Sequence, residues 1–229
     1  MTQTPITRTP SSDPTGTTPA VAADARCRSV IVLEGMPGAG KTTAAEALAR
    51  QGRTVLGEYL DHHGDTVPVT AHPGVDDDHA HQTNWLTKHQ HLSTAGCGPV
   101  FLDRDWVSAL AYAYSLPATA SAPVLAARAR WAAGHLQAGR LAVADTYVVF
   151  HLDVRLSLRR RATRLTRGHP WSHPHGLARL SRFYRDPPAA IERVHPRLAA
   201  AMRGARWRHL AGLSVEQTLR LLRELADRP

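Results

Sequence analysis

The sequence predicts an α/β protein of three layers, α/β/α, in which helices cover both faces of a parallel β-sheet. Three observations lead to this prediction. Short apolar runs with the length of buried strands alternate with longer helix-like segments. Such alternation is typical of βαβ units. The first apolar run also leads directly into a glycine-rich turn and a helix, as phosphate-binding loops do.

The elements follow from this pattern in chain order. Strands are expected at 29–35, 53–59, 98–103, 146–154 and 207–212. Helices are expected at 41–51, 84–96, 106–115, 122–138 and 155–167. A polar, histidine-rich stretch separates the second strand from the next helix, and 168–176 interrupts the helical pattern before two further helical stretches that run to about residue 204. The last helix begins at a capping box of Ser214 and Gln217.

The chain is expected to form one domain, residues 26–229, behind a disordered tail, residues 1–25, which is rich in Thr, Pro and Ala. The tail has no apolar h-region, and no run approaches the roughly 18 apolar residues of a membrane span. Cys27 and Cys97 form no metal or redox spacing. A reducing, cytoplasmic setting without membrane contact is therefore expected.

The net charge of +9 is carried almost entirely by arginine, because Lys41 and Lys88 are the only lysines in the sequence. A basic balance of this kind fits nucleic acid as a partner. It fits equally well with phosphorylated small molecules or with a surface that is charged for solubility. Charge alone leaves these three explanations open.

The phosphate loop is the most specific motif in the chain. Residues 35–42, GMPGAGKT, match G-x-x-x-x-G-K-[ST] without a mismatch. Its glycines let backbone N–H groups converge on phosphate oxygens, Lys41 would bridge the β- and γ-phosphates, and the Thr42 hydroxyl would bind Mg²⁺. The expected cofactors are therefore ATP and Mg²⁺. The residues expected to bind the nucleotide are Gly35, Met36, Pro37, Gly38, Ala39, Gly40, Lys41, Thr42 and Thr43.

The classes of nucleotide-binding protein can then be narrowed. The chain has no N-K-x-D motif, which a guanine-nucleotide switch uses to bind its base, and no transporter signature is present. A ring-forming motor would usually need a longer chain. Small kinases, which transfer a phosphoryl group to a small acceptor, remain.

An acidic and a basic residue end the third predicted strand. Asp103 and Arg104 follow the apolar run VFL, at the sheet edge where α/β proteins bind ligands. Asp103 is expected to help hold Mg²⁺ and Arg104 to reach the acceptor or the transferred phosphoryl group. Asp105, which precedes Trp106, is expected to cap the next helix.

The segment 155–167 is the most basic part of the chain. Leu158, Ala162 and Leu165 share one face of the predicted helix, and arginines occupy the opposite face with the same spacing. Such arginines would line a phosphate site, although a solvated face or a nucleic-acid contact gives the same pattern. The arginines on this face are Arg160, Arg164 and Arg167, of which Arg160 and Arg164 are the first candidates for catalysis.

Three segments together resemble the P-loop kinases of the thymidylate kinase and deoxynucleoside kinase group. They are LEGMPGAGKTT, FLDRDWVSALAY and VVFHLDVRLSLRRRATR, and the resemblance spans residues 29 to about 186. It implies the P-loop kinase fold, a five-stranded parallel sheet with the phosphate-loop strand in the middle, and a helical lid at about 160–180. It leaves a homodimer open, since dimers are common in this group.

The same resemblance indicates a catalytic base. Nucleoside kinases place a glutamate near the end of the second strand, where this chain has Glu58, with Asp61 as a second candidate. Thymidylate kinases usually carry an arginine-containing motif here, and its absence favours a neutral acceptor. Four aromatic residues are expected either to line the acceptor pocket or to belong to the core: Trp85, Trp106, Tyr112 and Tyr114.

The histidines of 62–91 lie beside Asp76, Asp77 and Asp78, which makes a zinc site conceivable. Their spacing matches no standard cluster, so a polar insertion on the acceptor side is the favoured interpretation.

The sequence therefore predicts an ATP-dependent phosphotransferase. Its expected acceptor is a hydroxyl group on a nucleoside, a nucleotide or a nucleoside-like natural product such as an antibiotic. Nucleic acid is not the expected partner. The alternatives are a P-loop ATPase associated with nucleic acid and a polynucleotide 5′-hydroxyl kinase.

Overall fold

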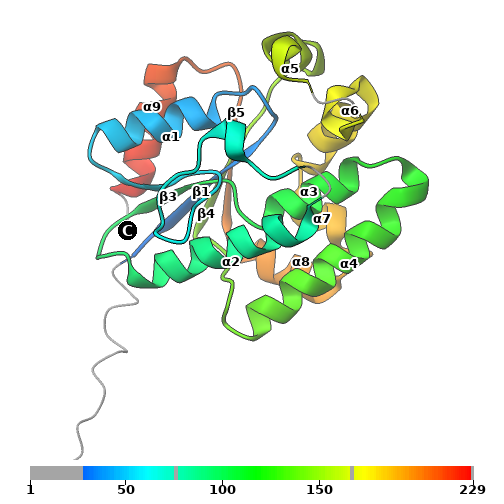
Figure 1. Ribbon diagram of the computed structural model, residues 1–229, viewed down its shortest axis with the longest axis horizontal. Helices are drawn as coiled ribbons and strands as arrows, with labels where there is room; N and C mark the ends of the chain where they lie inside the picture. The colour runs from blue at the N-terminus through cyan, green and yellow to red at the C-terminus, as the bar shows by residue number, and fades with distance from the viewer. Residues whose placement is uncertain (1–27, 75–76, 166–167, 228–229) are drawn as a thin grey trace, which may run out of the picture.

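The computed structural model describes residues 28–74, 77–165 and 168–227. Within these residues five strands form one parallel sheet in the order β2-β3-β1-β4-β5 (Figure 1). The strand that leads into the phosphate loop is therefore central, as predicted. The strands are β1 (Val30–Gly35), β2 (Thr54–Leu56), β3 (Val100–Asp103), β4 (Thr146–Phe150) and β5 (Arg206–Leu210).

Helices cover both faces of this sheet, so the predicted three-layer architecture is confirmed. Helices α1 (Lys41–Arg50) and α9 (Val215–Ala226) pack on one face, where Ile31 and Leu33 of β1 meet them. The opposite face, to which Val32 points, packs against the other helices (Figure 1). This alternation along one strand is what a sheet buried on both sides requires.

The remaining helices lie on or beside the second face. They are α2 (Asp78–Thr94), α3 (Val107–Ser115), α4 (Ala118–Gln137), α5 (Val154–Arg160), α6 (Pro174–Phe183), α7 (Pro187–Ile191) and α8 (Pro196–Arg203). The described residues also form three short 3₁₀ turns: η2 (Val69–Ala71), η3 (Ala162–Arg164) and η4 (Pro170–Ser172). No helix in the described part of the chain is long and apolar enough to cross a membrane.

Several predicted boundaries move because side chains cap the helices. Helix α2 begins at Asp78 and not near residue 84, because the Asp77 carboxylate accepts the N–H of Ala80. Helix α9 begins at the predicted capping box, in which Ser214 and Gln217 bond each other's backbone. Three helices, and not two, separate η4 from β5, because Asp186 and His195 each cap a new start that is followed by proline.

The prediction of one continuous helix over 155–167 is wrong. Helix α5 ends at Arg160, and a 3₁₀ turn follows at Ala162–Arg164. Arg161 leaves helical geometry with φ −112° and ψ 8°, while its guanidinium donates a hydrogen bond to the carbonyl of Trp171. A contact between distant segments therefore outweighs the local helical pattern.

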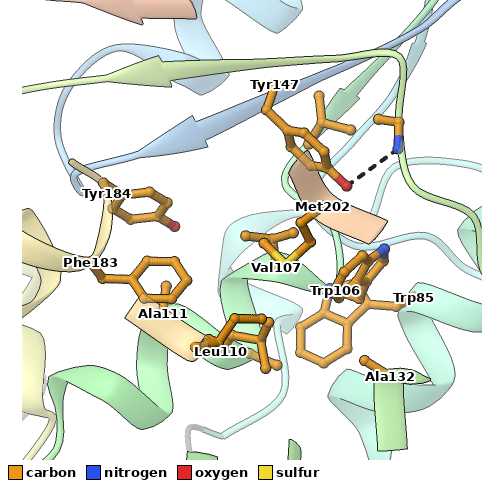
Figure 2. Packing of buried hydrophobic residues seen from close by; sticks show 14 of the residues in the cluster. Trp85, Trp106, Val107, Leu110, Ala111, Ala132, Tyr147, Phe183, Tyr184 and Met202 are labelled. Carbon is orange, nitrogen blue, oxygen red and sulfur yellow. Dashed lines mark hydrogen bonds between the residues drawn. The ribbon is translucent and has the colours of Figure 1, made fainter. Parts of the chain in front are cut away.

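The larger core lies beneath α3 and is rich in aromatic side chains (Figure 2). Trp106 is fully buried, and its indole N–H donates to the carbonyl of Ala142. The Tyr147 hydroxyl accepts the N–H of Ala144 and lies 3.4 Å from Asp105 Oδ2. This core fixes α3 against the sheet, and with it the residues at the end of β3.

Candidate functional site

The phosphate loop joins β1 to α1 and depends on its glycines. Gly35 has φ +121°, and a Cβ there would lie 2.3 Å from the Phe150 carbonyl oxygen on β4. Gly38 and Gly40 also have positive φ, which L-residues with a side chain rarely adopt. The loop therefore curls tightly around space in front of α1.

Lys41 lies inside this loop with only 5% of its surface exposed. Its Nζ donates to the carbonyl oxygens of Met36 at 2.9 Å and Gly35 at 3.3 Å. Burial, followed by the charge of Arg104, lowers the pKa of Lys41 to about 7. The ammonium therefore lacks a full countercharge, and an anionic group in the loop would supply one.

Thr42 and Asp103, the two residues expected to bind Mg²⁺, lie next to each other. The Thr42 hydroxyl donates to Asp103 Oδ2 at 2.7 Å. Asp103 Oδ1 is buried and has no hydrogen-bond partner among the described residues. Burial, followed by the charge of Glu58, raises the pKa of Asp103. Because a hydroxyl and a carboxylate are oxygen ligands of the kind that Mg²⁺ prefers, the pair fits a divalent cation.

Arg104 sits in an unusual backbone conformation. It has φ +65°, the only positive φ at a non-glycine position in the described chain. Lys88 from α2, fully buried, donates from Nζ to the carbonyl oxygens of Asp103 at 2.7 Å and Arg104 at 2.8 Å. This charge-assisted pair of hydrogen bonds stabilises a turn that would otherwise be strained.

The Arg104 side chain lies between two carboxylates. Its Nε is 3.0 Å from Glu58 Oε1, and its Nη1 is 3.5 Å from Glu34 Oε2. Glu34, fully buried on β1, also accepts hydrogen bonds from the hydroxyls of Ser108 and Tyr184. The guanidinium is therefore held in one orientation by β1, α3 and the loop after β2.

Glu58, the predicted base, lies in the loop that follows β2, and its side chain is 32% exposed. Burial would raise the pKa of Glu58, but the charges of Arg104 and Lys41 outweigh it and hold the pKa below its ordinary value. The carboxylate is therefore ionised. Asn84 of α2 fixes its backbone by donating to the Glu58 carbonyl at 2.9 Å. Asp61, the second candidate, does not line the cavity described below.

Asp105 is buried more deeply than a simple helix cap. Its carboxylate accepts the N–H of Val107, but Trp106, and not Asp105, is the N-cap residue of α3. Burial, followed by the charge of Glu34, raises the pKa of Asp105 to about 8. This carboxyl group is thus largely protonated at neutral pH.

Helix α5 is tied to the phosphate loop. The Ser157 hydroxyl donates to the Pro37 carbonyl at 2.7 Å, and Arg160 Nη1 donates to the Gly38 carbonyl at 3.1 Å. Arg161 lies alongside, since a Cβ on Gly38 would be 3.4 Å from its Cγ. Arg160 thus contacts the phosphate loop. The side chain of Arg164 and the whole of Arg167 lie outside the described residues.

One cavity of about 1070 Å³ joins these parts. Residues 37–44 of the phosphate loop line one end of it, together with Arg160 and Arg161. Glu58 and Arg104 line the other end, together with aromatic, histidine and arginine side chains. These are Tyr59, His72, His81, Trp85, Tyr112, Arg128, His169 and Trp171.

The four aromatic candidates divide between pocket and core. Tyr112 lines the cavity, Trp85 lines it and also belongs to the core, Trp106 is core alone, and Tyr114 packs against Phe183 outside the cavity. Two histidines of 62–91 also belong to the cavity wall. His81 Nδ1 lies 2.6 Å from the Tyr59 hydroxyl, and the His72 ring packs against the Tyr59 ring at a tilt of 49°. The described residues contain no group of three or more His, Cys, Asp or Glu placed to hold a metal ion.

Several residues of this site were not identified from the sequence, among them Glu34, Lys88, Arg161, His169 and Trp171. Two of them carried a signal. Glu34 is a carboxylate in an otherwise apolar strand, and Lys88 is one of two lysines in an arginine-rich chain. Arg161 and the residues of the turn at 169–171 acquire their places only through tertiary contacts.

Comparison with known proteins agrees with this architecture. The family model described as AAA domain matches residues 30–153. No curated protein sequence matches the chain. The fold is shared with deoxyadenosine kinase from M. mycoides in two nucleotide complexes. With dCMP and dCDP the TM-score is 0.56 at 12% identity, and with dCTP it is 0.55 at 13% identity; each match covers 86% of this chain and 97% of that one. The predicted P-loop kinase fold is thereby confirmed.

Proposed function

Because the chain belongs to the AAA domain family of P-loop proteins, we propose that it is an ATP-dependent kinase. The reaction would move the γ-phosphoryl group of ATP to a hydroxyl of a nucleoside or a nucleoside-like small molecule. The observation that carries the proposal is the single cavity, in which a phosphate loop and a Glu58–Arg104 pair face the same space.

The donor nucleotide would bind at the phosphate loop. Lys41, already buried and short of countercharge, would hold the phosphates, and the N–H groups of residues 38–43 would donate to their oxygens. Arg160 would give up its hydrogen bond to the Gly38 carbonyl and donate to a phosphate oxygen instead. Phosphoryl transfer needs this kind of positioning and charge stabilisation more than it needs covalent chemistry.

Thr42 and Asp103 are proposed to hold Mg²⁺. The unpartnered Oδ1 of Asp103 and the adjacent Thr42 hydroxyl support this role. When bound, the cation would neutralise phosphate charge and help to orient the phosphates. Lys88 would contribute indirectly, because it holds the carbonyl of Asp103 in place.

Glu58 is proposed to accept the proton of the attacking hydroxyl. It is ionised, and Arg104 fixes its orientation at 3.0 Å. As the hydroxyl attacks, its O–H bond would break and the proton would pass to a Glu58 oxygen. Arg104, itself oriented by Glu34, would then keep the protonated side chain beside the acceptor.

Charge pairing supports a neutral acceptor. The arginines lining the acceptor end, Arg104 and Arg128, already pair with Glu58 and Asp78 respectively. An acceptor that carried a phosphate would have to displace one of these carboxylates. The rings of Tyr59, Trp85 and Tyr112 offer flat apolar walls instead, which suit a nucleobase or a similar planar group.

The segment 160–180 is proposed to act as the lid. Its arginines include Arg160 and Arg161 at the donor end of the cavity, and Arg164 is proposed to join them when nucleotide binds. Covering the transferred group would exclude water and so favour transfer over hydrolysis.

The test is a screen for ADP formation with Mg·ATP and a panel of acceptors. The panel would contain nucleosides, nucleoside monophosphates, hydroxylated antibiotics and a 5′-hydroxyl oligonucleotide. The proposal expects turnover with a neutral nucleoside or nucleoside-like compound. Turnover with the oligonucleotide alone would favour the polynucleotide kinase alternative, and ADP formation independent of every acceptor would indicate an ATPase.

A further inference from the structure

The turn η4 at Pro170–Ser172 touches both ends of the cavity. It follows α5 and precedes α6 in the chain, and the sequence indicates only an interruption between helices here. His169 and Trp171 both line the cavity. The turn lies within the segment proposed as the lid, but that role assigns no task to His169 or Trp171.

Trp171 meets the donor side through its backbone and the acceptor side through its ring. Its carbonyl accepts a hydrogen bond from Arg161 Nη1 at 2.9 Å. Its ring lies against the Arg104 guanidinium, with 5.4 Å between the Arg104 Cζ atom and the ring centroid. A guanidinium at this distance from an indole face is attracted by the ring electrons.

The indole is held in place from two directions. Its Nε1 donates to the Ser115 hydroxyl at 2.9 Å, at the end of α3. On the other side α6 packs directly under the turn, because a Cβ on Gly176 would lie only 1.9 Å from the Pro170 carbonyl oxygen. Any side chain at position 176 would therefore push the turn away from α6 or toward the cavity.

His169 contributes a hydrogen bond and no charge. Its Nδ1 accepts the Trp171 N–H at 3.0 Å. Burial, followed by the charges of Arg161 and Arg104, lowers the pKa of His169 to about 4, so the ring is neutral at physiological pH. The turn therefore does not repel the two arginines that it contacts.

We propose that Trp171 is a positioning residue that aligns Arg104 with Arg161, so that the acceptor and donor ends of the cavity are built as one unit. The role rests on the proposed kinase function. In this role Trp171 orients Arg104, and the segment after α5 takes part in binding the acceptor.

Kinetics test the role of the ring. Trp171→Ala should lower kcat/KM for the acceptor about 2- to 30-fold, the range expected for losing a cation–ring contact. The dissociation constant of Mg·ADP should change less than about threefold, roughly less than the worth of one hydrogen bond, since the backbone carbonyl that Arg161 uses remains. Trp171→Phe keeps a ring and should restore most of the loss. Trp207→Phe, outside the cavity, is the matched aromatic control and should have no effect.

A second variant moves the turn without altering any cavity side chain. Gly176→Ala should reproduce the acceptor-side loss of Trp171→Ala, because the new methyl displaces Pro170. Gly134→Ala in α4 is its control, since no atom lies within 4 Å of a Cβ there. If Trp171→Ala and Gly176→Ala both keep the wild-type kcat/KM for the acceptor, the proposal is overturned.

Fluorescence separates this proposal from the kinase assignment. The emission that belongs to Trp171, taken as wild type minus Trp171→Phe, should change in ligand-free protein when Arg104→Gln is introduced. It should change again when Mg·ADP binds beside Arg161. An unchanged emission in the Arg104→Gln background would overturn the positioning role, even if a phosphoryl acceptor were found. Absence of any acceptor would refute the kinase function alone, because the emission test needs no turnover.

Discussion

The charge of Lys41 should depend on whether a nucleotide is bound. In the free protein, burial and the neighbouring Arg104 lower the pKa of Lys41 to about 7. Phosphate oxygens in hydrogen-bond contact would favour the ammonium and raise the pKa again. Binding of a nucleotide above pH 7 should therefore take up a proton.

The magnitude follows from the shifted value. At pH 8 a lysine with a pKa of about 7 is roughly 90% neutral, so binding should take up about 0.9 proton per site if the bound pKa exceeds 10. The same linkage predicts that the affinity for Mg·ADP falls by about 50-fold between pH 7 and pH 9, because one proton must be gained at every site.

Titration calorimetry in two buffers of different ionisation enthalpy measures this uptake. Lys41→Arg is the matched control, because arginine stays charged over the whole range and binding should then take up no proton at this position. Wild-type protein that binds Mg·ADP at pH 8 with less than about 0.3 proton taken up would refute the argument, because it would mean that the buried lysine keeps its charge unaided.

Two further predictions concern the frame of the site. Gly35→Ala should lower the free energy of unfolding by at least about 2 kcal/mol, because the new methyl group would meet the Phe150 backbone and because a φ of +121° disfavours any side chain. Gly52→Ala, at φ +77° with open space around it, should lower that free energy by only about 1 kcal/mol. Equal losses for the two variants in urea denaturation would contradict this prediction. Asp105→Asn should become more stable than wild type as pH rises. The folded pKa of Asp105, about 8, lies above its unfolded value, so the contribution of this group to the free energy of unfolding is complete below about pH 4 and falls by about 1.4 kcal/mol per pH unit toward pH 8. Parallel profiles of unfolding free energy against pH for the wild type and Asp105→Asn would contradict the burial argument.

The parts of the site that the sequence revealed are those defined by local order. The loop from Gly35 to Thr42 needs only its own glycines and the strand and helix beside it. Asp103 and Arg104 could be placed because a buried strand ends there, and parallel strands bring their ends to one edge. Glu58 could be named only through the resemblance to nucleoside kinases, which place a glutamate near the end of the second strand.

The parts that the sequence concealed depend on distant contacts. Lys88 becomes a clamp only because α2 packs beside the end of β3, where two carbonyls point at its ammonium. Helical spacing grouped Arg160 with Arg164, but α5 ends at Arg160, and Arg161 turns to Trp171. The helical spacing of residues 155–167 says nothing about Trp171, which lies outside that segment. Neither the contact of Trp171 with Arg104 nor the end of α5 could therefore be predicted from the sequence.

The kinase proposal is tested most directly by following the labelled γ-phosphoryl group of ATP. Protein incubated with labelled Mg·ATP and a nucleoside from the active part of the panel should place the label on the nucleoside hydroxyl. Lys41→Ala should abolish that transfer, and Glu58→Gln should slow it by about 10²- to 10⁴-fold, the usual contribution of a general base. Label found only in inorganic phosphate, or transfer retained in Lys41→Ala, would contradict the account.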